Sequence, residues 1–466
     1  MPTSNRPPVK ILDGAAIRRL RDRIRGPIIL PGDDAYDQAR RVFNTAFDRH
    51  PALIVRPRDE ADVARSILWA AEHDLPLAVR GGGHSLAGHG TGDGVLVLDL
   101  GSMRRLTIDS VRRLAHAEPG LTVGEFADRA HEKGLATSFG DSRSVGIGGL
   151  TLVGGIGYLL RRYGLAIDHL VEADLITADG RRLTASHDEH PDLFWALRGG
   201  GGNFGVVTRM TFLLHPVGTV YGGWLVLPAT PQTLRDCATL AADAPNELTV
   251  ILNVFRMPSL PFVPDRCWGE LVVAAAVVFA GDQAVAEEVL GPFRHLGLPY
   301  FDGVAPMAYR DIFRFSRNAH IGPHGTAART TFLDTLDDQV IDAALEYTAH
   351  APSDFAAGQL RVLGGAMSRV PGGETAFAFR DKPFLFSTLI EFEAGADPEP
   401  HVAWTEHFWA AVRPYGSGAY AGMLQDEGNA RIHEAYPAPT YERLAAVKRR
   451  YDPDNRFNRN QNILPA

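Results

Sequence analysis

The sequence has little cysteine, no long apolar run and no excess of positive charge. Its 466 residues include only two cysteines, Cys237 and Cys267, which excludes a disulfide framework and argues against a thiolate metal cage. A single disulfide between the two stays open. No apolar stretch reaches the roughly 18 residues of a membrane-spanning helix. Lys and Arg number 47 against 55 Asp and Glu, so the concentrated basic surface of a duplex-binding protein is not expected.

The chain is long enough for two or three domains, because domains usually have about 100–200 residues. Residues Met1–Pro8 carry no apolar run behind their charge, so a secretory leader is not expected and we predict a cytoplasmic protein. We expect a monomer or a homodimer whose partners are small molecules, without binding to nucleic acid or membrane.

Glycine, by contrast, is abundant. The 48 glycines make up about 10% of the chain against a usual value of about 7%. They gather in three segments, at residues 81–90, 140–164 and 199–205. Glycine lets a ligand approach the main chain closely, and a run of free N–H groups forms an anion-binding concavity. These segments favour a long, phosphate-containing ligand, and the alternative is three tight turns in an ordinary sheet protein.

The first half of the chain has a mixed α/β pattern. Residues 51–55 and 75–79 predict short strands, and the apolar spacing of residues 59–73 predicts an amphipathic helix between them. Such a unit places the first glycine segment at the carboxyl end of its second strand, where α/β proteins usually bind ligands. Further predicted elements are strands at 95–98 and 206–214, hairpins within 106–118 and 172–186, and a helix at 122–133.

From about Val217 glycine thins out and the pattern changes. Residues 222–395 alternate apolar strands with helices such as 282–291 and 337–349, which predicts a second α+β domain. Residues 439–451 predict a helix, and the tail after it is polar and rich in amides.

Motifs of other enzyme classes are weak or absent. Residues 200–205 fit G-x-G-x-x-G, but a strand pattern follows where a dinucleotide-binding loop needs a helix, so we reject an NAD site. His84 and His89 are five residues apart with no carboxylate beside them, so we expect no metal. No G-x-S-x-G elbow occurs. His84 itself has two interpretations, a histidine that caps a turn and a nucleophilic attachment point for a cofactor.

The glycine segments carry a family resemblance. The stretch Arg80–Ser85 (RGGGHS) resembles the flavin-attachment loop of the vanillyl-alcohol oxidase / p-cresol methylhydroxylase superfamily. More narrowly, the chain resembles berberine-bridge-enzyme-like FAD-linked oxidases over roughly residues 40–466. Other matching segments are residues 145–149, 154–157, 163–168, 193–205, 451–457 and 460–463.

The resemblance implies an α+β, two-domain, vanillyl-alcohol-oxidase-type FAD-binding fold with a substrate domain of antiparallel sheet and helices. We expect the FAD-binding domain over residues 1–216 and the substrate domain over residues 217–425. Residues 426–466 are expected to return to the FAD-binding domain.

The resemblance also implies FAD bonded through its 8α-methyl carbon to His84. Ser142 stands where many members have a second attachment cysteine, and Leu150 stands where many have a histidine. We therefore expect a single covalent link, as in the branch that includes bacterial hydroxynicotine oxidases.

The other predicted FAD contacts come from the glycine segments and the tail. The glycine main chain is expected to hold the pyrophosphate. Asn460 and Gln461 are expected to hydrogen-bond the flavin's pyrimidine edge, with simple tail packing as the alternative. The full predicted set is Arg80, Gly81, Gly82, Gly83, His84, Ser85, Gly88, His89, Ser142, Val145, Gly146, Gly148, Gly149, Gly155, Gly157, Asn460 and Gln461.

Three residues are predicted for the substrate side. Gln359 and Arg361 alternate on a predicted strand and so share one face, which either lines the pocket or is solvated. Tyr420 matches the first tyrosine of a Y-x-N-Y segment that doubly linked relatives use as a base, whereas Met423 replaces the second. Tyr420 is therefore the candidate base, which requires a lowered pKa, and a buried structural tyrosine is the alternative.

The predicted activity is that of an FAD-dependent oxidase. A small organic substrate would pass hydride from an alcohol or amine C–H to FAD, and O2 would reoxidise the flavin to give H2O2. Two alternatives stay open: a dehydrogenase with a protein or quinone acceptor, and a flavin-binding carrier without turnover.

Overall fold

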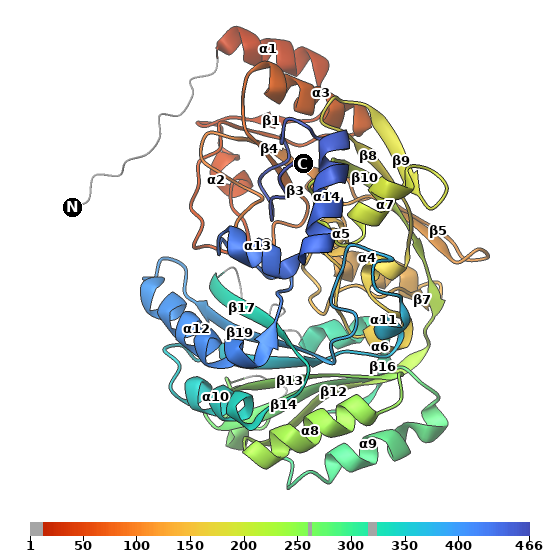
Figure 1. Ribbon diagram of the computed structural model, residues 1–466, viewed down its shortest axis with the longest axis vertical. Helices are drawn as coiled ribbons and strands as arrows, with labels where there is room; N and C mark the ends of the chain where they lie inside the picture. The colour runs from red at the N-terminus through yellow and green to blue at the C-terminus, as the bar shows by residue number, and fades with distance from the viewer. Residues whose placement is uncertain (1–12, 260–262, 316–323) are drawn as a thin grey trace.

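The first sheet contains the predicted strand–helix–strand unit. The computed structural model describes residues 13–259, 263–315 and 324–466, so the prediction made on Met1–Pro8 lies outside it. The strands and helices of this part are β1 (Ile28–Ile29), β2 (Leu53–Val55), β3 (Leu77–Arg80), β4 (Leu96–Asp99), α1 (Gly14–Arg23), α2 (Tyr36–Ala39) and α3 (Glu60–Glu72). The sheet order is β1-β2-β4-β3, and β2 and β3 both run parallel to β4 (Figure 1). Helix α3 begins where the Asp59 carboxylate accepts the N–H of Asp62.

The second sheet is antiparallel and contains both predicted hairpins. Its order is β5-β6-β10-β8-β9, with β5 (Leu106–Asp109), β6 (Leu114–Ala117), β8 (Leu170–Ile176), β9 (Arg182–Ser186) and β10 (Val206–Leu213). Because β10 begins directly after Gly205, the G-x-G-x-x-G segment leads into a strand, as its sequence predicts. Helix α4 (Val123–His131) starts with a reciprocal Thr122–Glu125 capping box and packs on this sheet through Phe126.

Shorter elements connect these two sheets to the rest of the chain. They are β7 (Leu135–Ala136), β11 (His215–Pro216), α5 (Ile147–Leu152), α6 (Leu160–Tyr163), α7 (Pro191–Leu197) and α11 (Ala366–Arg369). Strands β7 and β11 pair with each other.

The largest sheet has nine strands within the described residues. They are β12 (Thr219–Pro228), β13 (Leu248–Arg256), β14 (Leu271–Phe279), β15 (Phe301–Asp302), β16 (Ala305–Ala308), β17 (Gly325–Leu333), β18 (Ala356–Val362), β19 (Phe384–Phe392) and β20 (Gly416–Ser417). The order is β15-β12-β14-β13-β18-β19-β17-β20, with β16 also on β12, and neighbours are antiparallel. Four helices cover its outer face (Figure 1), namely α8 (Pro231–Asp243), α9 (Ala286–Arg294), α10 (Asp338–Ala349) and α12 (Glu399–Val412). This confirms the α+β architecture predicted for residues 222–395.

Strand alternation gives this sheet two different faces. On β13, Leu252 and Val254 point to the helices and belong to the same apolar cluster as α8 and α10. Ile251 and Asn253 point the opposite way, toward the glycine segments. The face turned toward the glycine segments, here called the inner face, therefore carries polar side chains such as Asn253, which are uncommon on a fully buried sheet face.

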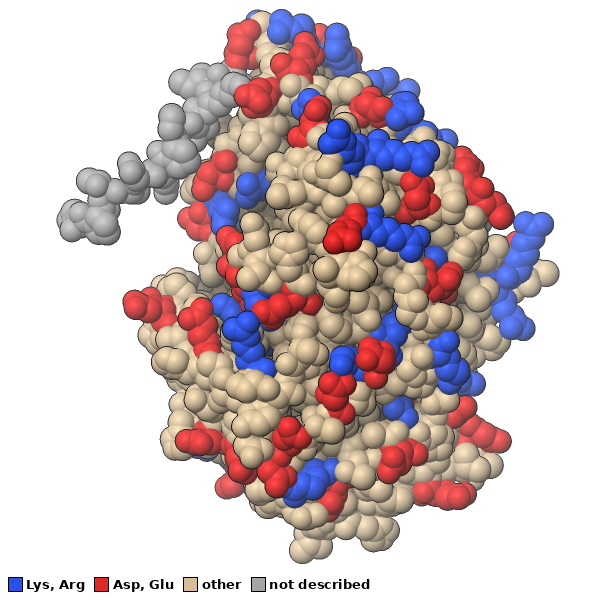
Figure 2. Space-filling view, viewed as in Figure 1, with Lys and Arg blue, Asp and Glu red and all other residues tan. Residues whose placement is uncertain are grey.

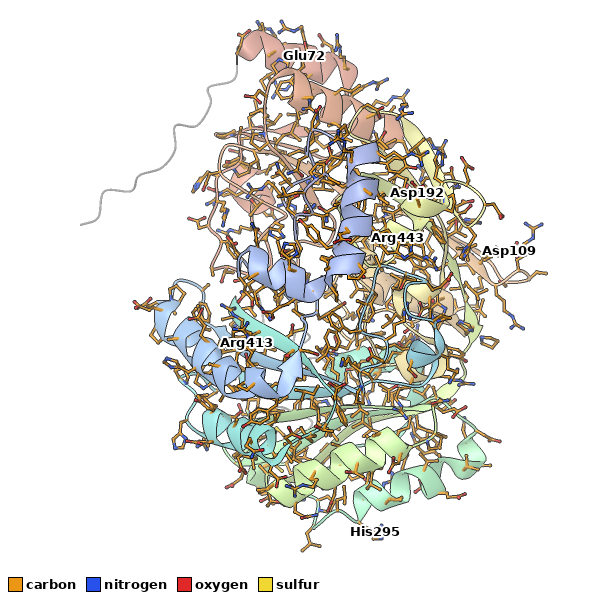
Figure 3. All side chains as sticks on the ribbon, viewed as in Figure 1. Glu72, Asp109, Asp192, His295, Arg413 and Arg443 are labelled. Atoms are coloured by element: carbon orange, nitrogen blue, oxygen red, sulfur yellow. The ribbon has the colours of Figure 1, made fainter. Side chains whose placement is uncertain are left out.

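The C-terminal residues pack beside the N-terminal sheets. Helices α13 (Asn429–Ala435) and α14 (Ala438–Tyr451) follow the nine-stranded sheet in the chain, and α14 lies beside α7 (Figure 1). Arg443, labelled in Figure 3, lies 3.8 Å from the centre of the Trp195 ring on α7. At the other end of α14, the Tyr451 hydroxyl donates to Asp192 at 3.1 Å. The tail after α14 is held as well, since Ile463 is fully buried.

Neither cysteine of the chain forms a disulfide, and the visible face carries charges of both signs. Cys237 and Cys267 are both buried and both free, so they form no disulfide with each other. On the face shown in Figure 2, basic and acidic groups are interspersed without a concentrated basic surface. None of the helices in the described ranges has the length and apolar content needed to cross a membrane.

Candidate active site

A cavity of about 450 Å³ lies between the glycine segments and the inner face of the nine-stranded sheet. Its walls include the loop after β3, residues 140–158, residues 201–207, the inner sheet face, residues 420–424 and the tail after α14. The segments predicted to hold a phosphate-containing ligand therefore face the same space as the strand predicted to line a pocket.

Two glycine segments meet at this cavity, backbone against backbone. A Cβ built on Gly82 would lie 2.4 Å from the amide nitrogen of Gly146, and one built on Gly146 would lie 2.4 Å from that of Gly82. No side chain fits at either position, so only glycine permits this approach. The result is a strip of bare main chain at the cavity wall, which is the arrangement that binds anionic groups through N–H donors.

Most of the predicted cofactor residues line the cavity. Fourteen do so: Arg80, Gly81, Gly82, Gly83, His84, Ser85, His89, Ser142, Val145, Gly146, Gly148, Gly149, Asn460 and Gln461. Gly88, Gly155 and Gly157 lie outside the lining, where each allows close packing. A Cβ at Gly88 would meet the Phe47 ring at 2.6 Å, and one at Gly157 would meet the Phe139 carbonyl oxygen at 2.2 Å.

His84 is positioned in the cavity wall by an aromatic neighbour. Its ring stacks on Phe43 with centroids 4.1 Å apart. Burial lowers the pKa of His84 to about 4, so the imidazole is neutral at pH 7 and keeps a nucleophilic lone pair. Burial, with a smaller effect of the Arg459 charge, also lowers the pKa of His89 to about 4.

Arg80 anchors the start of the first glycine loop. Its guanidinium donates to the Asp99 carboxylate at 2.9 Å and to the Ala39 carbonyl at 2.6 Å. Asp99 accepts a second bond from Arg56 at 2.9 Å. Burial opposes the charged form of Asp99, but the two arginines outweigh it and lower the pKa of that carboxyl.

A buried lysine holds the tail against the third glycine segment. The Lys448 ammonium donates to the carbonyls of Asn203 and Phe457 at 2.9 and 2.8 Å and pairs with Asp452 at 2.8 Å. The Asn203 amide donates to the Gln461 carbonyl at 3.1 Å. These bonds keep the tail at the cavity wall, where Asn460 and Gln461 were predicted to act.

The residues present fit FAD. The glycine strip offers main-chain N–H groups to a pyrophosphate, and neutral His84 offers a nitrogen to the flavin ring. The amide nitrogen of Asn460 is used by the Gly202 and Phe457 carbonyls, while its buried Oδ1 has no partner within the described part of the chain. Such an orphaned acceptor suits the N–H of a pyrimidine edge.

The inner sheet face carries a directional pair of amides. The Asn253 amide nitrogen donates to the Ile251 and Ala274 carbonyls, both at 3.3 Å, so its oxygen faces Gln359. Gln359 donates its amide N–H to that oxygen at 2.7 Å. The Gln359 Oε1 is left without a partner in the described residues.

Arg361 links the pocket face to the second glycine segment. It is buried and donates to Asp141 at 2.6 Å, and both residues line the cavity. Gln359 and Arg361 therefore both lie on the pocket side of β18, as their alternation predicts.

Several lining residues were not found from the sequence. Asn253, Glu391, Tyr158 and Trp224 all line the cavity, and Glu391 is almost fully buried. A sequence pattern does mark Asn253 and Glu391: each is a single polar residue between apolar neighbours on a central strand, β13 or β19. Such a residue is expected to face a cavity rather than the apolar core.

Tyr420 lies at the cavity but is not arranged as a base. Its hydroxyl oxygen accepts the Gly155 N–H at 3.2 Å. Burial raises the pKa of Tyr420 to about 12, so the phenol stays protonated near neutral pH. The electrostatics therefore favour the buried structural interpretation over the lowered pKa that a base requires.

Comparisons with known proteins agree with this geometry. The family profile described as "FAD binding domain" matches residues 51–186, and that described as "Berberine and berberine like" matches residues 424–464. The chain is 31% identical to (R)-6-hydroxynicotine oxidase of Paenarthrobacter nicotinovorans over 467 residues, covering 95% of this chain and 97% of the relative. It is 30% identical to the FAD-linked oxidoreductase YgaK of Bacillus subtilis over 455 residues, covering 95% and 98%.

Solved structures show the same fold. That of 6-hydroxy-D-nicotine oxidase from Arthrobacter nicotinovorans has a TM-score of 0.84 and 28% identity, covering 95% of this chain and 98% of that one. Xylooligosaccharide oxidase from Myceliophthora thermophila has a TM-score of 0.86 at 24% identity, covering 97% and 99%.

The fold and the site define an oxidoreductase with an FAD-binding domain. Within that class, the chain belongs to the berberine-bridge-like family of FAD-linked oxidoreductases.

Proposed function

We propose that the protein is an FAD-dependent oxidase of a small organic substrate, with FAD attached through a single bond to His84. The observation that carries this proposal is the backbone contact of Gly82 with Gly146 at a cavity that also contains neutral His84 and the polar face of β18. The wall formed by the glycine segments suits a dinucleotide, and the opposite wall formed by β18 suits a substrate.

FAD, when bound, supplies the hydride acceptor and its reoxidation by O2. The chain's own residues would bind the FAD and orient it. The main chain near Gly82 and Gly146 would hold the pyrophosphate, Asn460 would accept from the pyrimidine edge, and Ser142 leaves no thiol for a second attachment. We further propose the division into residues 1–216, 217–425 and 426–466.

The substrate side favours a molecule that carries a hydrogen-bond donor. The free Gln359 Oε1 accepts only from an O–H or N–H, which both substrate types proposed here, alcohols and amines, can supply. A substrate with such a donor would gain a hydrogen bond worth about 0.5–1.5 kcal/mol, which a substrate without one lacks. Trp224 and Phe255 add apolar walls for a carbon skeleton.

The role of Tyr420 follows from its contacts. With its hydroxyl occupied by Gly155 and its pKa raised, Tyr420 would shape the pocket rather than remove a proton. An amine that arrives neutral needs no such base before hydride transfer.

Attachment is tested by acid precipitation of the purified protein. We expect yellow colour in the pellet of the wild type and of His89→Ala, and its loss from the pellet of His84→Ala. The matched control is His89, since it lines the same cavity and has its pKa lowered to the same value. Colour released to the supernatant by the wild type would contradict the covalent link.

Turnover is tested with a panel of amines, aromatic alcohols and oligosaccharides. The expected result is H2O2 formation with matching O2 uptake for one chemical class. Anaerobic reduction by a substrate without reoxidation in air would instead identify a dehydrogenase. Tightly bound flavin that no panel member reduces would favour a carrier.

A further inference from the structure

Two side-chain amides join the loop that carries His84 to the substrate sheet. The Leu86 carbonyl, two residues after His84, accepts from the amide nitrogens of both Asn44 and Gln425 at 3.2 Å. The Thr326 carbonyl on β17 accepts from the same two amides, at 3.1 Å from Asn44 and 2.9 Å from Gln425. Each amide therefore bridges the loop and the strand directly.

The amide oxygens are occupied in a way that fixes their orientation. Asn44 Oδ1 accepts the N–H of Thr326 at 3.1 Å, and Gln425 Oε1 accepts the N–H of Ala328 at 3.0 Å. The two side chains thus cap the edge of β17 where β20 does not reach, since β20 pairs only with Phe332 and Leu333. Flipping either amide would break both its carbonyl and its N–H contacts.

The backbone around Asn44 strengthens this connection. Phe43 donates its N–H to the Gly83 carbonyl at 3.0 Å and stacks on the His84 ring. Thr45 donates its N–H to the His324 carbonyl at 3.0 Å, at the start of β17. Residues 43–45 therefore contact both the loop and the strand.

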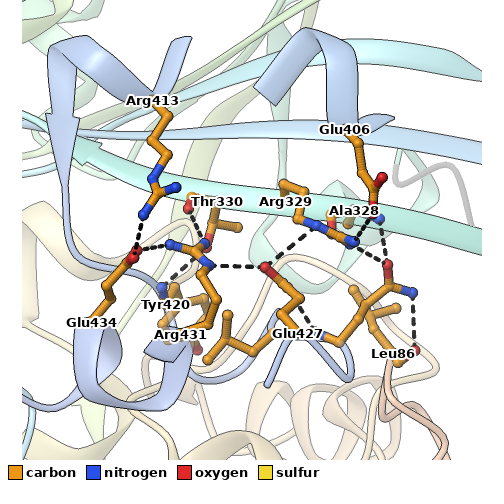
Figure 4. A network of polar contacts seen from close by, with 12 residues as sticks. Leu86, Ala328, Arg329, Thr330, Glu406, Arg413, Tyr420, Glu427, Arg431 and Glu434 are labelled. Carbon is orange, nitrogen blue, oxygen red and sulfur yellow. Dashed lines mark hydrogen bonds and ion pairs between the residues drawn. The ribbon is translucent and has the colours of Figure 1, made fainter. Parts of the chain in front are cut away.

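Gln425 also contacts a network of charged groups that includes Arg329, Glu427 and Arg431 (Figure 4). Arg329 donates to Gln425 Oε1 at 2.9 Å, and the Gln425 N–H donates to Glu427 at 3.1 Å. Glu427 is nearly buried and pairs with Arg431 at 2.9 Å. These contacts fix the main chain and the side-chain oxygen of Gln425, while its amide nitrogen bonds to the Leu86 carbonyl in the His84 loop.

We propose that Asn44 and Gln425 are positioning residues that set the distance and angle between the His84 loop and the substrate sheet. The proposal rests on the proposed function, because a flavin bonded to His84 would take its position relative to Gln359 and Arg361 from this two-amide clamp. Neither amide lines the cavity, so both act through the loop.

The test uses Gln425→Glu and Asn44→Asp in the full-length holoprotein. Each variant keeps an oxygen that caps the β17 N–H group but loses the N–H donors to the Leu86 carbonyl. We expect amide hydrogen exchange over residues 83–89 to become about fivefold faster, from the loss of one net hydrogen bond. The Thr326 and Ala328 amides should stay protected. We also expect a changed visible circular dichroism of the flavin and less acid-stable colour.

Glu434→Gln is the matched control, because Glu434 pairs with Arg413 and Arg431 at the outer end of the same network without touching the loop. It should alter thermal stability but neither the loop exchange nor the flavin signal. Unchanged loop exchange in both amide variants would overturn the clamp, as would equal effects in the control. A wild type that binds no flavin would refute the proposed function instead, while loop exchange still decides the clamp.

Discussion

A single methyl group at Gly146 should separate the two glycine segments that form the proposed pyrophosphate cradle. The Cβ of Gly146→Ala would lie 2.4 Å from the Gly82 nitrogen and 2.8 Å from its Cα, roughly 1 Å inside ordinary contact. Both opposing atoms are main chain, so relief requires one loop to move. Overpacking of this kind costs about 1–3 kcal/mol. In a domain of this size, that corresponds to a melting temperature lower by about 2–12 °C.

Flavin content and thermal unfolding, measured together, check this reasoning. Gly146→Ala should be both less stable and paler than the wild type, because the displaced loops no longer present their N–H groups together. Gly149→Ala is the control for stability alone, since a Cβ there meets nothing within 4 Å of protein, although Gly149 also lines the cavity. The control should keep its stability or gain up to about 1 kcal/mol from helix propensity. A Gly146→Ala protein as stable as this control would refute the argument from contact.

Three further outcomes follow from the site and its surroundings. Tyr420→Phe should lower the rate of flavin reduction by substrate less than tenfold in stopped-flow kinetics, whereas loss of a general base costs about 10²–10⁴-fold, so a drop beyond a hundredfold would contradict the structural role. Gln359→Leu should raise KM about tenfold with little change in kcat in a steady-state peroxide assay, and an unchanged KM would exclude the acceptor role. Burial lowers the pKa values of His169 and His215 to about 3 and about 4 from 6.5. Between these values and pH 6.5 the unfolded chain therefore binds more protons than the folded chain. The contribution of the two neutral histidines to stability is complete above about pH 6.5 and is lost as the pH falls toward 4. Thermal unfolding between pH 4 and 7 should be less pH-dependent in His215→Phe, and an identical profile would count against the pair.

The fold could be predicted largely because its signals are local. The helical spacing before His73 and the turn at residues 178–180 each depend on a few neighbouring residues, and α3 and the β8–β9 hairpin formed as predicted. The glycine segments were informative for a similar reason, since Gly82 and Gly146 have contacts that no other residue type permits.

The rest of the site depends on distances along the chain that no local pattern encodes. Asn44 bonds to Thr326, 282 residues away, and Gln425 bonds to Leu86, 339 residues away. Single amides have no periodicity, so nothing in the sequence distinguished them from surface residues. Tyr420 shows a different limit, because its motif position was visible but its pKa depends on burial that only the folded chain creates.

The Lys448 anchor has a consequence for the order of events during synthesis. One cavity wall includes His84 and another includes Gln461, which Lys448 and Asn203 hold in place. At a translation rate of about 5–20 residues per second, the second wall is made roughly 20–75 s after the first. The nascent chain therefore displays an open half-site throughout most of its synthesis. Enclosure of a dinucleotide therefore waits until the residues after Lys448 have been made, and a ribosome stalled before residue 448 would carry a protein that lacks this wall.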